Sequence, residues 1–183
     1  MTPQPGDILA VRSPGTAARL IRFGAALREL VTGNAEPNMD NHIAVAHHTD
    51  KAGTLWCLEG RPGGVGWRDA RDYLASPWTV SNVGQPKTDE QRKTVTDGAV
   101  AMIGTAYDWE GIAADAALAI GLDFRPRFGQ VPGHVVCSSL AAWLYGKAGL
   151  AKPDGDREVS PADWLTFIIS HKYQLPLASK TAG

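Results

Sequence analysis

Cysteine is scarce in this sequence of 183 residues, which contains only Cys57 and Cys137. So few cysteines exclude a scaffold built on several disulfides. The first residues also lack the basic region and apolar core of a secretory signal peptide, so we expect synthesis in the cytoplasm without export by that route. In a reducing compartment both cysteines are expected to be free thiols, with one disulfide as the alternative.

Long apolar runs and an excess of one charge are also missing. The longest apolar stretch, residues 112–122, is interrupted by Asp115 and falls well short of the ~20 residues that a membrane-spanning helix needs. The 18 basic side chains nearly balance the 19 acidic ones, for a net charge of -1. Without a strong positive field we expect no binding to nucleic acid and none to an anionic membrane surface.

The composition is typical of a single globular domain. A chain of 183 residues with 44% hydrophobic content can bury a sizeable core, so we predict one domain over residues 1–183. No internal repeat or low-complexity tract divides it. Residues 178–183 are expected to form a short flexible C-terminal tail.

Hydrophobic periodicity and turn residues predict an α+β fold, in which a small antiparallel sheet packs against helices. Thr88 and Gln91 form the pattern of a capping box at a helix start, and Pro161 suits the first position of the last helix. The predicted strands are 8–11, 41–48, 54–60, 65–67 and 78–83. The predicted helices are 16–31, a short turn at 69–74, 88–103, 112–120, one that starts near residue 137 and stops at 149, and 161–168.

The strands 41–48 and 54–60 are expected to form a hairpin around the polar residues 49–53. Symmetric pairing about this loop places His42 directly opposite Glu59 on one face of the sheet. A slip of one residue would send Glu59 to the other face. In this register Ala44 lies opposite Cys57, and the other face forms core from Ile43, Val45, Trp56 and Leu58.

Cys137 lies where an apolar, extended segment turns into a helix. The free N–H groups and the positive dipole end of a helix favour an anion, so this position lowers the pKa of a thiol and raises its thiolate fraction. We therefore predict that Cys137 is a nucleophile. Since cysteine is among the most buried residue types, an inert core thiol is the alternative.

A thiol hydrolase also needs an imidazole that manages protons and a polar group that orients it. His42 and Glu59 are the candidates for these two roles. His134, three residues before Cys137, is the competing base. Glu59 could instead be a solvated residue at a strand end.

The remaining candidates concern metals and substrate contacts. His47 and His48 are neighbours in a predicted strand, so their side chains should point to opposite faces and cannot chelate one ion. We expect neither a metal site nor a cofactor. Tyr107 and Trp109 are predicted to line a substrate cleft, although aromatic residues near loops also serve ordinary packing.

Five short motifs occur in a telling order: Gly6-Asp7-Ile8, Asn41-His42-Ile43-Ala44-Val45, Leu58-Glu59-Gly60, Gly104-Thr105-Ala106-Tyr107-Asp108 and Val136-Cys137-Ser138-Ser139-Leu140. In this respect the chain resembles the circularly permuted branch of the NlpC-type papain-like hydrolases, the YaeF/YiiX-like proteins. The resemblance implies a papain-like fold of permuted topology. It also implies that Cys137 is the nucleophile, His42 the base and Glu59 the third polar residue, with Tyr107 at the site.

The sequence departs from this family at two positions. Ser139 stands where permuted relatives often carry Glu, and Val136 stands where standard NlpC enzymes carry Asp. Both changes loosen the substrate assignment without removing a reacting group. The Asn-Cys-Glu-His-Phe signature of the lecithin retinol acyltransferase relatives is absent, which argues against lipid acyl transfer.

The resemblance implies a cysteine peptidase or amidase that cuts peptides of the bacterial cell wall through an acyl-thioester on Cys137. A phage particle, a lysis event or a secretion apparatus could deliver it to the wall, and a cytosolic role is equally allowed. The alternatives are a thioesterase or acyltransferase on lipid-like acyl groups, and a catalytically silent binding or virion module.

Overall fold

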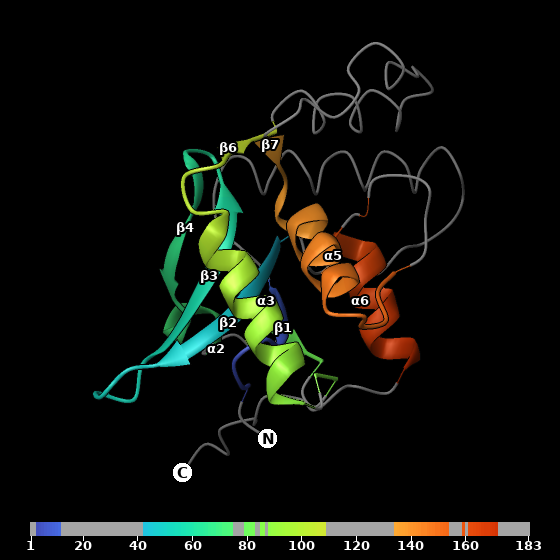
Figure 1. The fold of residues 1–183 in the computed structure, drawn as a ribbon, viewed down its shortest axis with the longest axis horizontal. Helices are drawn as coiled ribbons and strands as arrows, with labels where there is room; N and C mark the ends of the chain where they lie inside the picture. Colours follow the sequence, from blue (N-terminus) through green and yellow to red (C-terminus); the bar gives the residue numbers. More distant parts are fainter. Residues whose placement is uncertain are drawn as a thin grey trace.

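The computed structural model describes residues 3–11, 42–74, 79–82, 85–86, 88–108, 134–153, 159 and 161–171. A five-stranded antiparallel sheet with the order β4-β3-β2-β1-β5 is its main element (Figure 1). The strands are β1 (Ile8–Val11), β2 (His42–Thr49), β3 (Leu55–Arg61), β4 (Gly64–Asp69) and β5 (Val80–Ser81).

Helices and a second, smaller sheet complete the described fold. The helices are α2 (Arg71–Leu74), α3 (Asp89–Ala101), α5 (Cys137–Lys147) and α6 (Pro161–Ser170). Strands β6 (Ala106–Tyr107) and β7 (His134–Val135) pair in parallel beside the start of α5 (Figure 1). The predicted α+β class, with a small antiparallel sheet packed against helices, is confirmed.

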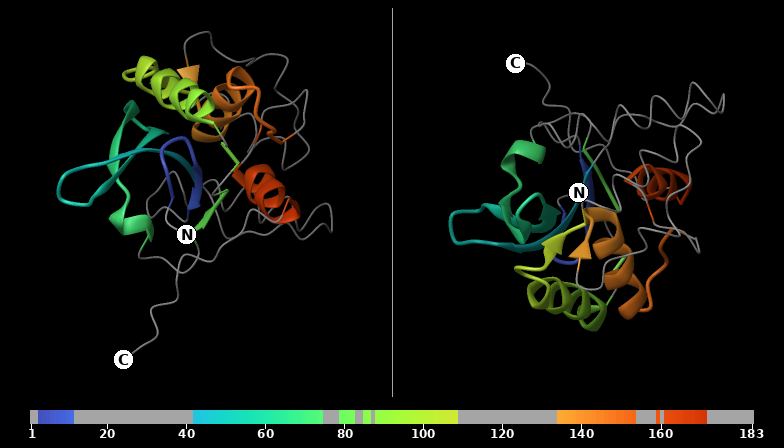
Figure 2. Two further views of the ribbon diagram at one scale, coloured as in Figure 1. Left: turned by 60° about the horizontal axis from the view of Figure 1, so that its bottom comes forward. Right: turned by 90° about the horizontal axis from the view of Figure 1, so that it is seen from above.

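Both faces of the large sheet are covered along β1 and over most of β2 and β3. The predicted core positions Ile43, Val45 and Leu58 face α3, α5 and α6, whereas the alternate positions pack against α2 on the opposite face (Figure 2). Trp56, the fourth predicted core position, is only half-buried. Because both faces are covered, polar side chains that point from these strands toward α2 are removed from water and need partners.

The predicted hairpin register is wrong by two positions. Cys57 pairs with Ala46 instead of Ala44, and a bulge separates Ala46 from His48. The loop begins one residue later than predicted because the Asp50 carboxylate accepts hydrogen bonds from the N–H groups of Ala52 and Thr54. Since the shift is even, every side chain inward of the bulge keeps its predicted face.

Most predicted helix limits agree with the structure. The capping box of Thr88 and Gln91 is confirmed, and α3 ends two residues before the predicted limit. Helix α5 begins at Cys137, and Gly149 follows its end with φ of 63°. Helix α6 begins at Pro161 and runs two residues beyond its predicted end. The predicted helices 16–31 and 112–120 and the C-terminal tail lie outside the described residues.

Buried hydrogen bonds fix α5 against the N-terminal strand. The Tyr145 hydroxyl donates to the Gly6 carbonyl at 2.8 Å and accepts from the Asn82 side chain at 2.7 Å. The Asn82 side chain in turn accepts from the Ile8 N–H at 2.6 Å. At the other end of α5, the Trp164 indole donates to the Ser138 carbonyl. These contacts hold the first turn of α5 at a defined place over the sheet.

Replacing Tyr145 by Phe should therefore lower the free energy of unfolding by about 1–3 kcal/mol, because the buried Gly6 carbonyl loses its donor. Urea denaturation measures this change. Trp143→Phe is the matched control on the same helix: Trp143 is 42% exposed, and its replacement should change stability by no more than about 0.5 kcal/mol. Equal stability of the two variants would contradict the anchoring role of Tyr145.

Candidate functional site

Cys137 is the first residue of α5, as the sequence predicts. The preceding Val136 is extended, with φ of -97° and ψ of 161°, so the chain passes from β7 directly into the helix. The first turn carries no acidic side chain. The Ser139 hydroxyl accepts a hydrogen bond from the Val136 N–H at 3.2 Å, which closes the turn beneath the thiol. The first turn of the helix therefore adds no negative charge of its own and favours a thiolate.

The end of β3 packs closely against this helix start. A Cβ atom on Gly60 would lie only 3.3 Å from the backbone nitrogen of Cys137. A glycine thus lets the strand carrying Glu59 and Arg61 approach the first turn of α5.

The imidazole of His42 meets the thiol of Cys137. His42 is the first residue of β2, and its ring lies near enough to the Cys137 side chain for each group to shift the pKa of the other. Its Nε2 atom lies 2.8 Å from Oε2 of Glu59. Since Nε2 is engaged there, Nδ1 is the ring nitrogen left for the sulfur. The backbone N–H of Ile43 also donates toward the sulfur.

His42 and Glu59 contact each other diagonally, because the two-residue register shift separates them along the strands. Diagonal neighbours on one face of a sheet remain within reach of long side chains. The structure therefore brings together the three residues that the sequence predicts, Cys137, His42 and Glu59. All three are buried, and only 2% of the Cys137 surface is exposed.

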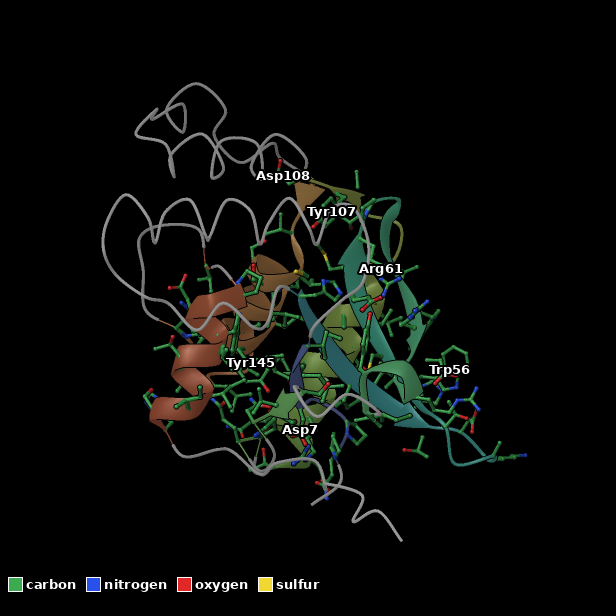
Figure 3. The ribbon with its side chains drawn as sticks, turned by 180° about the vertical axis from the view of Figure 1, so that it is seen from behind. Asp7, Trp56, Arg61, Tyr107, Asp108 and Tyr145 are labelled. Carbon is green, nitrogen blue, oxygen red and sulfur yellow. The ribbon has the colours of Figure 1, made fainter. Side chains whose placement is uncertain are left out.

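Two further residues belong to this polar cluster and were missed by the sequence analysis. The Arg61 guanidinium forms an ion pair with Oε1 of Glu59, and the Tyr73 hydroxyl donates to Oε2 at 2.9 Å. Arg61 also donates to the Tyr73 hydroxyl oxygen. Figure 3 shows Arg61 at the end of β3. Its position two residues after Glu59, on the same face, was a signal for it, whereas Tyr73 comes from α2 and had none.

The electrostatics of the cluster favour a thiolate–imidazolium pair. Burial alone lowers the pKa of His42, but the adjoining Cys137 sulfur and the Glu59 carboxylate outweigh it and raise that pKa to about 10. Burial raises the pKa of Cys137, and His42 then brings it below its ordinary value. Burial likewise opposes ionisation of Glu59, yet His42 and Arg61 hold its pKa below the usual range.

The other cysteine offers a contrast. Cys57 is a free thiol that is completely buried on β3. Burial raises its pKa, and the Glu59 carboxylate raises it further. Both cysteines are therefore desolvated, but the charges that shift the pKa of Cys57 are the carboxylates of Glu59 and Asp69, whereas the imidazole of His42 lowers that of Cys137.

Backbone pairing between two short strands places Tyr107 near Cys137 in the fold. It pairs in β6 with Val135 of β7, two residues before Cys137, and its side chain is largely buried (Figure 3). The predicted cleft residue Trp109 lies outside the described residues. The competing base His134 pairs with Ala106 through its backbone, and its side chain also lies outside the description.

The prediction that His47 and His48 point to opposite faces is wrong. The bulge beside them turns both rings to one side, where their Nδ1 atoms are 3.0 Å apart and both contact Trp67 edge-on. A bulged strand loses the alternation on which the prediction relied. Within the described part of the chain, no group of three or more His, Cys, Asp or Glu side chains could hold a metal ion.

The close packing of Gly60 gives a test of the site geometry. Gly60→Ala should lower stability by about 1–3 kcal/mol through overpacking, and it should slow alkylation of Cys137 because the start of α5 moves away from His42. Gly66→Ala is the matched control, since a Cβ there has no neighbour within 4 Å. Urea denaturation and the iodoacetamide rate measure the two effects. Identical behaviour of both variants would contradict the tight contact.

No helix among the described residues is long and apolar enough to cross a membrane. No protein-family model matches the chain, and no curated protein matches its sequence.

Proposed function

We propose that the protein is a cysteine hydrolase of the amidase or endopeptidase type that acts through an acyl-thioester on Cys137. The observation that carries the proposal is the buried chain of contacts from Cys137 to His42 to Glu59, which favours a thiolate beside an imidazolium. A structural thiol needs no such partner, and the pKa of Cys57 in the same sheet is raised instead of lowered.

Each group has a defined task in this reaction. The Cys137 thiolate attacks the carbonyl carbon of the scissile amide, and the carbonyl oxygen becomes an oxyanion. The N–H groups at the start of α5 are placed to stabilise that oxyanion, because they have no partners within the helix. When the C–N bond breaks, the His42 imidazolium gives its proton to the leaving amine, and the acyl group remains on sulfur.

Hydrolysis of the thioester completes the cycle. Neutral His42 takes a proton from water, and the resulting hydroxide equivalent attacks the acyl carbon. The C–S bond breaks, the carboxylic acid leaves, and Cys137 returns as a thiolate beside the protonated ring. Glu59 keeps Nε2 engaged throughout, so Nδ1 stays directed at the sulfur.

The proposed substrate class is the peptide portion of bacterial peptidoglycan, and the proposed fold is papain-like with permuted topology. The support is the resemblance of the ordered motifs to the permuted NlpC-type proteins. In keeping with it, the strand that carries His42 precedes the helix that carries Cys137. Ser139, at a position where relatives often carry Glu, serves here to close the first turn of the helix.

The ionisation of Cys137 is the first test. Because His42 lowers its pKa, the thiolate should persist below pH ~8.5, the region where an ordinary thiol protonates, and be lost only as the pH falls through the lowered value. Iodoacetamide should therefore label Cys137 at about neutral pH and leave Cys57 unlabelled, as read by peptide mass spectrometry. Cys57 is completely buried and Cys137 is 2% exposed, so the pH dependence of Cys137 labelling is the readout that reports ionisation.

His42→Ala provides the control for this measurement. Without the imidazolium, burial is left to raise the pKa of Cys137, and labelling should move to pH above ~8.5. Equal labelling of the two cysteines in the unmodified protein would overturn the proposal and favour a catalytically silent module.

Turnover is the second test. Purified peptidoglycan fragments should release new amino termini in the presence of the protein, and Cys137→Ser should reduce the rate by about 10³-fold or more. Mass spectrometry of the products identifies the bond that is cut. Release at the same rate by the Cys137→Ser variant would show that another group is responsible.

A further inference from the structure

We propose that Arg61 and Tyr73 are positioning residues that keep Glu59 ionised and locked against His42, and thereby sustain the thiolate of Cys137. The inference deepens the proposed function and rests on it. Neither residue belongs to the three that the sequence assigned to the site.

The Glu59 carboxylate has both oxygens engaged. Oε2 accepts from the Tyr73 hydroxyl and lies against Nε2 of His42, while Oε1 is paired with the Arg61 guanidinium. The Tyr73 hydroxyl is itself held, because it accepts a hydrogen bond from Arg61. The hydrogen bonds at Oε2 and the ion pair at Oε1 together oppose rotation of the carboxylate away from the imidazole. The orientation of the His42 ring therefore depends on contacts from both β3 and α2.

The balance of buried charge points to the same role. An ionised Cys137 and an ionised Glu59 place two negative charges in the interior, and His42 supplies only one positive charge. Arg61 supplies the second, so the four groups are neutral together. A buried charge without a partner is costly, and it responds by changing its protonation state. Arg61 is thus the group that allows Glu59 and Cys137 to be anionic at the same time.

Arg61 lies at the edge of the buried cluster, so it can neutralise Glu59 while part of its own side chain stays in water. Its side chain is 34% exposed, whereas that of Glu59 is almost completely buried. Tyr73 is a neutral donor, since burial and the Glu59 charge raise its pKa. The other titratable neighbours are Cys57 on β3, a protonated thiol, and Arg68 on β4, which lies 6.0 Å from the centre of the Tyr73 ring.

Loss of Arg61 should raise the pKa of Cys137. Without this cation Glu59 takes up a proton at higher pH, and a protonated Glu59 no longer stabilises the His42 imidazolium. Protonation of Glu59 also removes its direct repulsion of the Cys137 thiolate, but this effect is smaller than that of His42, so the pKa of Cys137 rises overall. The acid limb of Cys137 alkylation should accordingly move upward by about one pH unit in Arg61→Met. Arg61→Lys keeps the positive charge, so its acid limb should stay close to that of the unmodified protein. A small upward shift should remain, because lysine cannot contact Glu59 and Tyr73 together as a fork.

Tyr73→Phe is the second variant, and it should shift the acid limb in the same direction by a smaller amount, because only one hydrogen bond to Glu59 is lost.

Arg71→Met is the matched control: Arg71 is an exposed arginine of α2 whose carboxylate partner is Asp69, and its loss should leave the profile unchanged. Iodoacetamide rates from about pH 4 to 9 on the full chain give all five profiles. Should Arg61→Met fail to fold, Tyr73→Phe decides the matter, because it is the other variant with a predicted shift.

The outcomes separate this inference from the proposed function. An ordinary thiol titration of Cys137 in the unmodified protein would overturn the proposed function itself. A low acid limb in the unmodified protein that is unchanged in Arg61→Met and Tyr73→Phe would overturn the positioning role alone. A purely structural role would lower stability without moving the pH profile, so the profile distinguishes the two.

Discussion

The hydrogen bond between Nε2 of His42 and Oε2 of Glu59 fixes the orientation of the His42 ring, on which the other contacts of the site depend. Burying these groups away from water is unfavourable unless each has a partner, and the 2.8 Å contact supplies one for both. It also settles which ring nitrogen faces the thiol. The pKa of Cys137 depends on that choice, because a rotated or neutral imidazole would leave a buried sulfur that stays protonated.

Much of this arrangement was readable from residue patterns. Alternation along two strands placed His42 and Glu59 on one face, and this survived a wrong register because the error was an even number of residues. The helix start at Cys137 followed from the change from an extended apolar segment to helical spacing. Local patterns therefore predicted the faces and the helix limit correctly, although they misplaced the strand pairing itself.

The parts that could not be predicted depend on local irregularity or on distant packing. The bulge before His48 turns two adjacent histidine rings to one side, and no residue type in the strand predicts this bulge. Tyr73 reaches Glu59 only because α2 folds over the sheet, a tertiary contact that periodicity does not encode. Arg61 is an intermediate case, since its spacing from Glu59 was visible but its partners were not.

The anchoring of α5 determines at which stage of folding the surroundings of Cys137 are complete. The hydrogen bond from Tyr145 to Gly6 joins residues 139 positions apart, so the contact order of this region is high. Such long-range closure comes after the entropy of a very large loop has been overcome. A nascent or partly unfolded polypeptide consequently carries an ordinary sulfhydryl at residue 137, and the lowered pKa of this thiol arises only with the completed tertiary structure.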